Sequence, residues 1–334
     1  MSYQLLRRLL FRLESETAHN LASVSFEALA TLCPPVLRRA GVKDQPVTFK
    51  GVEFPNRLGL AAGFDKAGRF LNGAQLLGFG FTEVGAVTPK PQPGHPKPRM
   101  WRYPAQRALR NRMGFNNPGT WALAKALTRR PAGLPVGVNL GKNAATALEE
   151  AADDYRASLE SLYGLADFFV VNVSSPNTQG LRRLQESGLP ELLGGLSKRC
   201  TELSERFELK RRPLLVKLSP DGPQESLAPL ASAAVEAGVD GFIAANTTSR
   251  REGQYSEVPA EGGLSGPLLH QRAVEMISEL RGVCGDEVLL VGCGGVHNRQ
   301  TYQNFLQAGA DLVQLYTGLV YEGPGLVRRV LKGE

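Results

Sequence analysis

The stretch ESLAPLASAAVEAGVDGFIAA (residues 225–245) contains the unit from which most of the chain is built. Its first part reads as a helix, a glycine follows where the helix should end, and a short apolar run then reads as a buried strand. The same succession of helix end, glycine and strand recurs in LLGFGF (76–81) and LQAGADLV (306–313). Helices that alternate with strands in this way predict an α/β fold with a parallel sheet.

Eight short apolar runs of this kind occur along the chain, each followed by glycines or polar residues. They are LGLAA (58–62), FTEVGAV (81–87), PVGVN (135–139), FFVVN (168–172), LLVKL (214–218), GFIAA (241–245), VLLVG (288–292) and DLVQLY (311–316). Eight parallel strands are the number that closes a barrel, so we predict a (β/α)8 TIM barrel. The alternative, two Rossmann-like halves, would place a GxGxxG turn near the start of one half, and the sequence contains none.

The first forty residues differ from this pattern. In YQLLRRLLFRL (3–13), leucines 6, 9, 10 and 13 share one helical stripe, and arginines 7, 8 and 12 lie off it. Ser15 or Thr17 could cap a second helix that ends before Pro34. We therefore divide the chain into a helical segment, 1–40, and a barrel domain, 41–334, that begins with a short β-hairpin at 47–54.

Two roles of the N-terminal segment fit its pattern. The helices could simply dock on the barrel, which periodicity alone slightly favours, or they could form an amphipathic hairpin at a membrane surface. A targeting peptide fits less well, because Glu14 and Glu16 occur too early for one.

Composition limits the functions that the chain can serve. It has 334 residues, 42% of them hydrophobic, and no apolar run that could span a membrane or act as a signal peptide. Its four cysteines form no CxxC pair and its four histidines are dispersed, so we predict free thiols and no metal site. The net charge of +7 is compatible with nucleic acid, an anionic membrane surface or an anionic small molecule as a partner.

Functional residues of such a barrel lie at the C-terminal ends of its strands. The residues that follow the eight runs are mostly amides, hydroxyls and lysines, with Asp65 as the only nearby acid. The linkers after the second, fourth and sixth runs are long, as active-site loops often are. Glycines in VGCGGV (291–296) and LYTG (315–318) suit a phosphate bound by backbone N–H groups. This set favours a phosphate-bearing cofactor that carries out the difficult chemistry, and FMN fits.

Several blocks of the sequence resemble dihydroorotate dehydrogenases, in order along nearly the whole chain. They include AAGFDK (61–66), NRMGFNN (111–117), VNLGKN (138–143), VNVSSPNT (171–178), VKLSPD (216–221), ANTT (245–248) and GGLSG (262–266). Ser175 stands where the soluble class has cysteine, and an amphipathic extension precedes the barrel. Both features resemble the bacterial, quinone-linked class 2 enzymes.

The resemblance implies FMN-dependent oxidation of (S)-dihydroorotate to orotate in de novo pyrimidine biosynthesis, with ubiquinone or menaquinone as the electron acceptor. Ser175 would remove the proton from C5 while a hydride leaves C6, and a hydroxyl needs help from its surroundings for this task. Amides would recognise the donors and acceptors of the substrate ring. The implied substrate-binding residues are Lys66, Asn111, Arg112, Met113, Gly114, Phe115, Asn172, Asn177, Asn246 and Thr247.

The resemblance also implies the residues that hold FMN. They are Ala62, Gly63, Phe64, Asp65, Lys66, Ala86, Asn139, Asn172, Lys217, Ala245, Gly266, Gly295, Tyr316 and Thr317. Lys217 would stabilise negative charge at the N1–C2 edge of the flavin. Ala86 and Ala245 stand where we expect threonine, so backbone atoms or water would replace those hydroxyls. His19 and Arg102 match positions near the quinone path, which assigns segment 1–40 to membrane and quinone access.

These implications describe a monomer that binds lipid peripherally at the cytoplasmic face of the bacterial inner membrane and binds no nucleic acid. A flavin barrel that reduces uridines in transfer RNA would also be basic. It would need a cysteine base and an added RNA-binding domain, and Ser175 and the short C-terminus argue against it. A non-catalytic membrane-associated barrel is a third possibility, and the intact set of polar residues at the strand ends argues against it.

Overall fold

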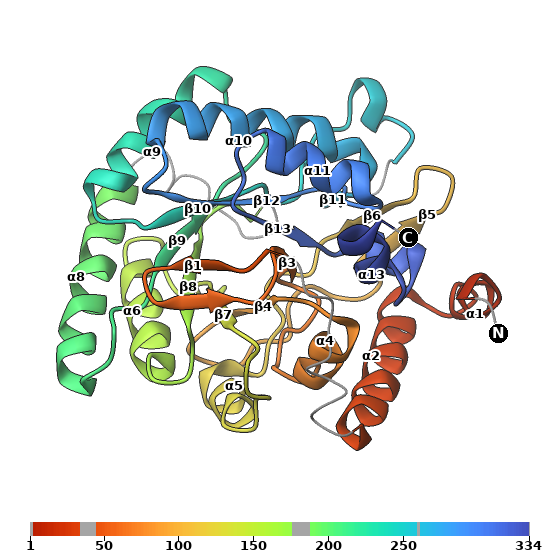
Figure 1. Ribbon diagram of the computed structural model, residues 1–334, viewed down its shortest axis with the longest axis horizontal. Helices are drawn as coiled ribbons and strands as arrows, with labels where there is room; N and C mark the ends of the chain where they lie inside the picture. Colours follow the sequence, from red (N-terminus) through yellow and green to blue (C-terminus); the bar gives the residue numbers. More distant parts are fainter. Residues whose placement is uncertain (1–2, 34–44, 176–187, 259–260, 334) are drawn as a thin grey trace.

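The computed structural model describes residues 3–33, 45–175, 188–258 and 261–333, so Asn177 lies outside the described residues. Parallel strands form a closed barrel in the order β10-β12-β13-β3-β4-β7-β8-β9 (Figure 1). Their bounds are β3 (Leu58–Leu60), β4 (Phe81–Val87), β7 (Val136–Leu140), β8 (Phe168–Asn172), β9 (Leu214–Lys217), β10 (Gly241–Ala244), β12 (Leu289–Cys293) and β13 (Leu312–Leu315). The predicted (β/α)8 barrel and its eight strand segments are confirmed.

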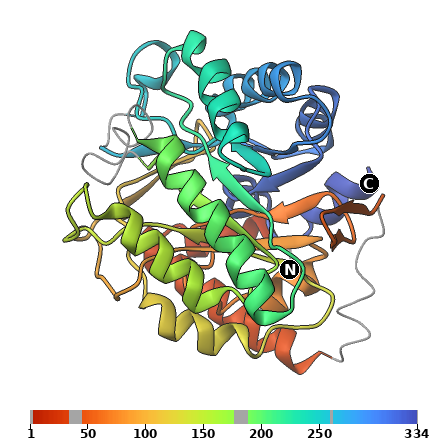
Figure 2. The ribbon, with the colours of Figure 1, turned by 90° about the vertical axis from the view of Figure 1, so that its left-hand side faces the viewer.

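Helices cover the outside of the barrel, with α9, α10 and α11 opposite α4 and α5 (Figure 1) and α6 beside α8 (Figure 2). They are α4 (Leu71–Leu77), α5 (Gly119–Leu127), α6 (Ala151–Leu162), α8 (Leu189–Phe207), α9 (Leu227–Glu236), α10 (His270–Cys284), α11 (Arg299–Gln307), α12 (Thr317–Glu322) and α13 (Leu326–Lys332), with short 3-10 helices η1 (Gln224–Ser226), η2 (Gly253–Tyr255) and η3 (Pro267–Leu269). Gly78 and Gly309 follow α4 and α11 with φ of 92° and 103°. Glycine adopts these angles readily, which explains why it separates helix from strand in the repeated unit.

Two apolar clusters hold the barrel together. The larger one packs outward-facing strand residues, such as Val84 and Phe169, against the helices. The smaller one fills the N-terminal end of the barrel lumen, where the ring centroids of Phe54 and Phe81 lie 5.3 Å apart and those of Phe81 and Phe168 lie 6.2 Å apart. Phe54 comes from the predicted hairpin of β1 (Val47–Phe49) and β2 (Val52–Phe54), so this hairpin closes one end of the barrel.

A small antiparallel sheet joins two long loops at the other end. It contains β5 (Met100–Tyr103) and β6 (Ala108–Asn111) from the loop after β4, and β11 (Gly263–Ser265) from the loop after β10. The sequence predicted that these loops are long but gave no sign that they pair. The pairing holds Asn111, the last residue of β6, near the strand ends.

The two predicted N-terminal helices are present as α1 (Tyr3–Leu10) and α2 (Ser15–Leu32), and Leu13 lies beyond the end of α1. The predicted caps of α2 are wrong. The carboxylate of Glu14 accepts hydrogen bonds from the N–H groups of Glu16 and Thr17, in place of a Ser15 or Thr17 cap. A carboxylate is favoured there because it faces the positive end of the helix dipole.

Helix α1 rests on the end of the chain. The Tyr3 hydroxyl donates to the carbonyl oxygen of Val320 at 2.6 Å, and the Arg7 guanidinium donates to that of Tyr321 at 2.7 Å. Both acceptors belong to α12, so helices near the two ends of the described chain are in direct contact.

Polar side chains dock α2 on the barrel, which is one of the two roles that its sequence pattern fits. The Glu16 carboxylate binds the Arg99 guanidinium at 2.7 and 3.0 Å, and the Glu27 carboxylate accepts from the N–H of Gly73 in α4 at 2.6 Å. The leucines of the same helix face outward: Leu21, Leu29 and Leu32 are 53%, 57% and 83% exposed. Docking therefore leaves an apolar helix face uncovered.

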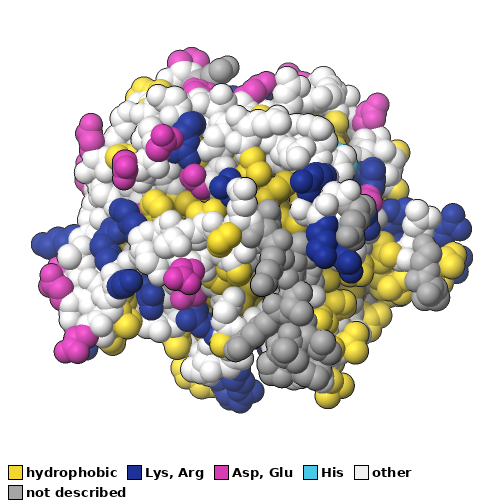
Figure 3. Space-filling view, viewed as in Figure 1, with side chains coloured by type: hydrophobic (Ala, Val, Ile, Leu, Met, Phe, Trp, Pro, Cys, Tyr) yellow, Lys and Arg dark blue, Asp and Glu magenta, His cyan; other side chains and the backbone are white. Residues whose placement is uncertain are grey.

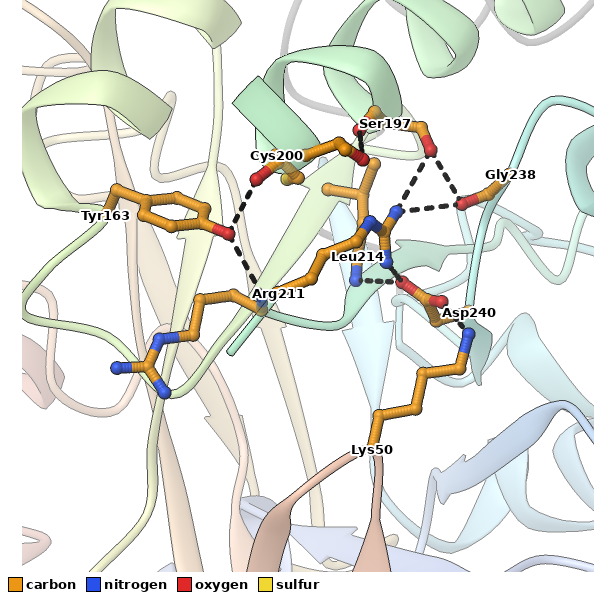
Figure 4. A network of polar contacts seen from close by, with 10 residues as sticks. Lys50, Tyr163, Ser197, Cys200, Arg211, Leu214, Gly238 and Asp240 are labelled. Carbon is orange, nitrogen blue, oxygen red and sulfur yellow. Dashed lines mark hydrogen bonds and ion pairs between the residues drawn. The ribbon is translucent and has the colours of Figure 1, made fainter. Parts of the chain in front are cut away.

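Asp240 organises the end of the barrel at which the strands begin (Figure 4). Its carboxylate is almost fully buried and accepts from the Leu214 N–H at 2.8 Å and from Arg211 Nη1 at 2.6 Å. It also pairs with Lys50, in the turn of the β1–β2 hairpin. One acid therefore links the hairpin, the start of β9 and the start of β10.

Replacing Asp240 should destabilise the fold without altering the structure at the C-terminal ends of the strands. We expect Asp240→Asn to lower the free energy of unfolding by about 2 kcal/mol, because Arg211 and Lys50 lose the buried negative charge that they pair with and an NH₂ group replaces one acceptor oxygen. The measurement is chemical denaturation of the purified variant. Asp286→Asn is the control, because the Asp286 side chain is 99% exposed, and equal stability of the two variants would contradict the assignment.

Candidate active site

A cavity opens at the C-terminal ends of the barrel strands and gathers most of the predicted site residues. Those that line it are Ala62, Gly63, Lys66, Ala86, Asn111, Met113, Gly114, Phe115, Asn172, Ser175, Lys217, Ala245, Asn246, Thr247 and Tyr316. The other lining residues are Ala61, Met100, Leu109, Ser265, Leu269, Cys293 and Gly294. No Asp, Glu or His is among these lining residues of the described chain. Among the described lining residues, the side chains able to transfer a proton are therefore hydroxyls, lysines and a thiol.

Other predicted residues lie beside the cavity without lining it. Asp65 accepts from the N–H groups of Arg69 and Phe70, so its carboxylate holds the loop after β3. Arg112 forms an ion pair with Glu261 at 3.1 Å. The remaining ones are Phe64, Asn139, Gly266, Gly295 and Thr317, and each contacts or neighbours a lining residue.

A chain of asparagine amides runs along the wall of the cavity. Asn172 Nδ2 donates to Asn139 Oδ1 at 3.1 Å, and Asn246 Nδ2 donates to Asn172 Oδ1 at 3.2 Å. Asn246 Nδ2 also donates to Ser174 Oγ at 3.0 Å. Ser175 follows at once and is 5% exposed, so the candidate base sits at the edge of an ordered amide network.

A buried ion pair lies below this chain, inside the barrel. Glu83 on β4 is fully buried, and its carboxylate lies 3.6 Å from Lys217 Nζ on β9. Burial alone would lower the pKa of Lys217, and the negative charge of Glu83 raises it above its usual value. Glu83 is not among the site residues predicted from the sequence. The signal was present, because an acid in the middle of the buried run FTEVGAV must have a partner.

The second lysine of the cavity has no acid at ion-pair distance among the described residues. Lys66 Nζ donates to the carbonyl oxygen of Gly63 at 2.9 Å. Burial lowers the pKa of Lys66 to about 8, against a smaller raising effect of Glu16. The two lysines therefore differ: Lys217 holds its proton firmly, and Lys66 loses its proton in mildly alkaline solution.

The loop of the NRMGFNN block is fixed by backbone geometry and by Gln92. Gly114 and Phe115 have φ of 68° and 52°, and a Cβ on Gly114 would lie 2.6 Å from the His95 ring. Gln92 Nε2 donates to the carbonyl oxygens of both residues at 3.1 Å. This arrangement explains why the loop needs glycine where it does and how it presents Asn111 and Phe115 to the cavity.

Glycines form a close-packed cradle beyond β12 and β11. Gly295 has φ of 69°, and a Cβ there would lie 2.8 Å from the carbonyl oxygen of Gly266. Ser265 Oγ and Thr317 Oγ1 are 2.8 Å apart at the same place. Small residues, backbone N–H groups and hydroxyls at the end of the last strands suit a phosphate group.

His19 belongs to α2 and Arg102 to β5, and both make contacts between the N-terminal segment and the loops around the cavity. His19 Nε2 donates to the carbonyl oxygen of Phe64 at 2.9 Å, and burial lowers the pKa of His19 to about 4. The Arg102 guanidinium donates to the carbonyl oxygen of Leu10 at 3.1 Å and lies over the Phe11 ring. Both residues therefore tie the N-terminal segment to the loops around the cavity.

No three His, Cys, Asp or Glu side chains in the described ranges are arranged to hold a metal ion. Within those same ranges, no helix has the length and apolar character needed to cross a bilayer.

Comparison with known proteins agrees with the geometry of the site. Residues 45–333 match the dihydroorotate dehydrogenase family. A dihydroorotate dehydrogenase (quinone) of Coxiella burnetii (strain Dugway 5J108-111) is 43% identical over 99% of this chain and 96% of its own length. One of Methylococcus capsulatus is 45% identical over 98% and 96%.

A solved structure is similar over almost the whole chain. It is the DHODH of Eimeria tenella in complex with ferulenol, which has 33% identity, a TM-score of 0.83, and coverage of 95% of this chain and 89% of its own. Fold, cavity, family match and relatives lead to one conclusion: the chain belongs to the dihydroorotate dehydrogenase family.

Proposed function

We propose that the protein oxidises dihydroorotate to orotate, with FMN as its cofactor and a membrane quinone as the electron acceptor. The observation that carries this proposal is the position of Ser175, a buried hydroxyl in a cavity lined by amides and lysines and free of carboxylates and imidazoles in its described part. The relatives named dihydroorotate dehydrogenase (quinone) support the same reaction.

The residues of the cavity fit FMN. The glycine cradle at Gly266 and Gly295 suits its phosphate, Lys217 offers a cation, and Ala86 and Ala245 give the ring room where a larger side chain would stand. Asn139 and Asn172 would complete the ring site through their amides. When bound, FMN supplies the hydride acceptor and passes the electrons on to the quinone.

The protein's own groups would bind the substrate and remove its proton. Asn111, Asn172 and Asn246 can each donate and accept, which matches a pyrimidine ring with alternating N–H and C=O groups. Protonated Lys66 would attract the carboxylate. Ser175 Oγ takes the proton from C5 as its own hydroxyl proton passes to water, and the surrounding amide dipoles stabilise the charge that develops.

Segment 1–40 would serve membrane and quinone access, as a unit distinct from the catalytic domain 41–334. Hydrophobic side chains gather over α2 and beside α1, next to Lys and Arg side chains (Figure 3). The exposed leucines of α1 include Leu5, Leu6 and Leu9. Arginines 7, 8, 12, 107 and 329 line one cleft between α1 and α12. An apolar face beside a basic cleft suits peripheral binding to an anionic bilayer, here assigned to the cytoplasmic face of a bacterial inner membrane.

Ser175→Ala should separate proton removal from cofactor binding. We expect the variant to keep FMN and to show flavin reduction by dihydroorotate slowed by roughly 10²–10⁴-fold, the usual contribution of a positioned base. Stopped-flow bleaching of the flavin absorbance measures this rate. Ser161→Ala, an exposed serine of α6, is the matched control, and a reduction rate near that control in the Ser175 variant would remove Ser175 from this role.

Orotate binding should weaken above about pH 8, the value at which Lys66 loses its proton. The protonated form attracts an anionic ligand, so the dissociation constant of orotate should rise by up to about tenfold per pH unit above that value. Titration between pH 7 and 9 measures it. Lys66→Gln should bind more weakly and with a flatter profile, whereas the exposed Lys198→Gln should follow the unmodified protein. A flat profile in the unmodified protein would contradict the role of Lys66.

The leucines of α1 should matter for the quinone and not for dihydroorotate. Substitutions are preferable to deletion, because α2 also holds Arg99 and α4. We expect Leu6→Ser with Leu9→Ser to reduce vesicle binding and turnover with a long-chain quinone, while flavin bleaching by dihydroorotate stays unchanged. Leu209→Ser with Val283→Ser is the control, since those side chains are 37% and 39% exposed elsewhere on the surface.

The arginines of the cleft should add an electrostatic part to that binding. Arg8→Gln with Arg12→Gln should weaken binding to anionic vesicles by about 1 kcal/mol per charge and leave binding to neutral vesicles unchanged. The difference between binding to anionic and to neutral vesicles should shrink as salt is added.

The leucine variant can also contradict the access role of segment 1–40. An equal loss of flavin reduction by dihydroorotate and of flavin reoxidation by quinone would reject this role, and so would unchanged turnover with the long-chain quinone.

A further inference from the structure

Glu83 occupies an unusual place for an acid. Its side chain is fully buried in the barrel lumen, between the aromatic cluster at one end and the cavity at the other. Its oxygens accept from Asn139 Nδ2 at 2.6 Å and from Gln314 Nε2 at 2.8 Å, and Lys217 Nζ lies 3.6 Å away. A carboxylate held this far from water persists only if its partners compensate its charge.

The first consequence concerns the charge of Lys217. The two cavity lysines are both buried, and Lys66, which has no carboxylate at ion-pair distance among the described residues, has a pKa of about 8. Lys217 has Glu83 beside it, and its pKa is raised. The comparison indicates that, without Glu83, burial would lower the pKa of Lys217, as burial lowers that of Lys66.

The second consequence concerns the direction of the asparagine chain. An ionised carboxylate only accepts hydrogen bonds, so the NH₂ group of Asn139 must face Glu83 and its oxygen must face Asn172. Asn172 must then turn its own oxygen to Asn246. One acid in the lumen thereby fixes the orientation of three amides, two of which line the cavity.

We infer that Glu83 is a positioning residue, which keeps Lys217 charged at the cofactor and sets the direction of the amides that meet the substrate. This inference rests on the proposed function and adds to it a residue that does not line the cavity. The ionisable groups that face Lys217 are Glu83 from β4 and Cys293 from β12, whose pKa burial raises, so the thiol stays neutral. Asn139, Asn172 and Gln314, from the strands around, carry no charge.

The test compares holoenzymes at pH 7.5 and 9.5, a range above the second ionisation of a phosphate group at about pH 6. The readouts are the rate of FMN release on dilution, followed by flavin fluorescence, and the flavin midpoint potential. In Glu83→Gln we expect Lys217 to lose its proton within this range. FMN release should therefore become roughly tenfold faster between pH 7.5 and pH 9.5. This increase should come on top of the change that loss of the Lys66 proton causes in the unmodified protein. The potential should fall more steeply with pH than in the unmodified protein.

Three further variants make the result specific. In Glu83→Gln with Lys217→Met the excess pH response should vanish, and this variant has no lone buried charge, so it should fold even if Glu83→Gln does not. Glu83→Asp keeps the charge but is shorter, so it should keep the unmodified pH response and raise the KM for dihydroorotate several-fold. Asp167→Asn, a carboxylate paired with Arg130 before β8, is the control and should change none of these quantities.

The outcomes separate the inference from the proposed function. Absence of FMN from the unmodified protein would reject the function itself. If FMN release and the midpoint potential of FMN-loaded Glu83→Gln depend on pH as they do in the unmodified protein, the role of Glu83 in keeping Lys217 charged is overturned. The same role is overturned if the extra pH dependence persists in Glu83→Gln with Lys217→Met. An unchanged KM in Glu83→Asp would overturn the role in orienting the amides. If Glu83→Gln fails to fold and its partner double variant folds, the coupling of the two charges is supported.

Discussion

Closure of the barrel is the constraint on which the rest of the structure depends. Strands without a free edge enclose one lumen, and every group inside it must be packed or hydrogen-bonded. Phenylalanine rings from the hairpin and the strand starts fill one half of this lumen. The other half holds Glu83 and Lys217, which can be buried there because they compensate each other. The polar layer under the cavity and the gathering of all strand ends at one rim are results of the same closure.

Helix α2 shows how two tasks share one element. Its outward leucines form the surface suited to a bilayer, while its polar side chains reach the loops around the cavity through Arg99, the Phe64 carbonyl oxygen and the start of α4. The side of the protein that would meet quinone and the side that would meet dihydroorotate are therefore held by the same helix. Its removal would disturb both, which is why the exposed leucines of α1 are better targets for separating them.

Much of this architecture could be predicted from the sequence, because the barrel repeats one local unit whose glycines and apolar runs are visible residue by residue. The amides and lysines of the cavity could be placed for the same reason, since strand ends of a barrel share a rim. Contacts between distant loops could not. The β5–β6–β11 sheet, the Glu16–Arg99 pair and the Glu83 network join segments far apart in the sequence. A local pattern can mark Glu83 as a buried acid that needs a partner, but it does not identify which distant residue the partner is. The Glu14 cap was missed because hydroxyl residues are the commoner caps.

The contact of α1 with α12 has a consequence for the order in which the molecule is assembled. Tyr3 and Arg7 are separated by 317 and 314 residues from their acceptors, the carbonyl oxygens of Val320 and Tyr321. Sequence separation of this size makes a contact slow to form, and domains fold as units once their chain is available. Because synthesis runs from α1 toward α12, α1 can make this contact only after the barrel strands between them have been made.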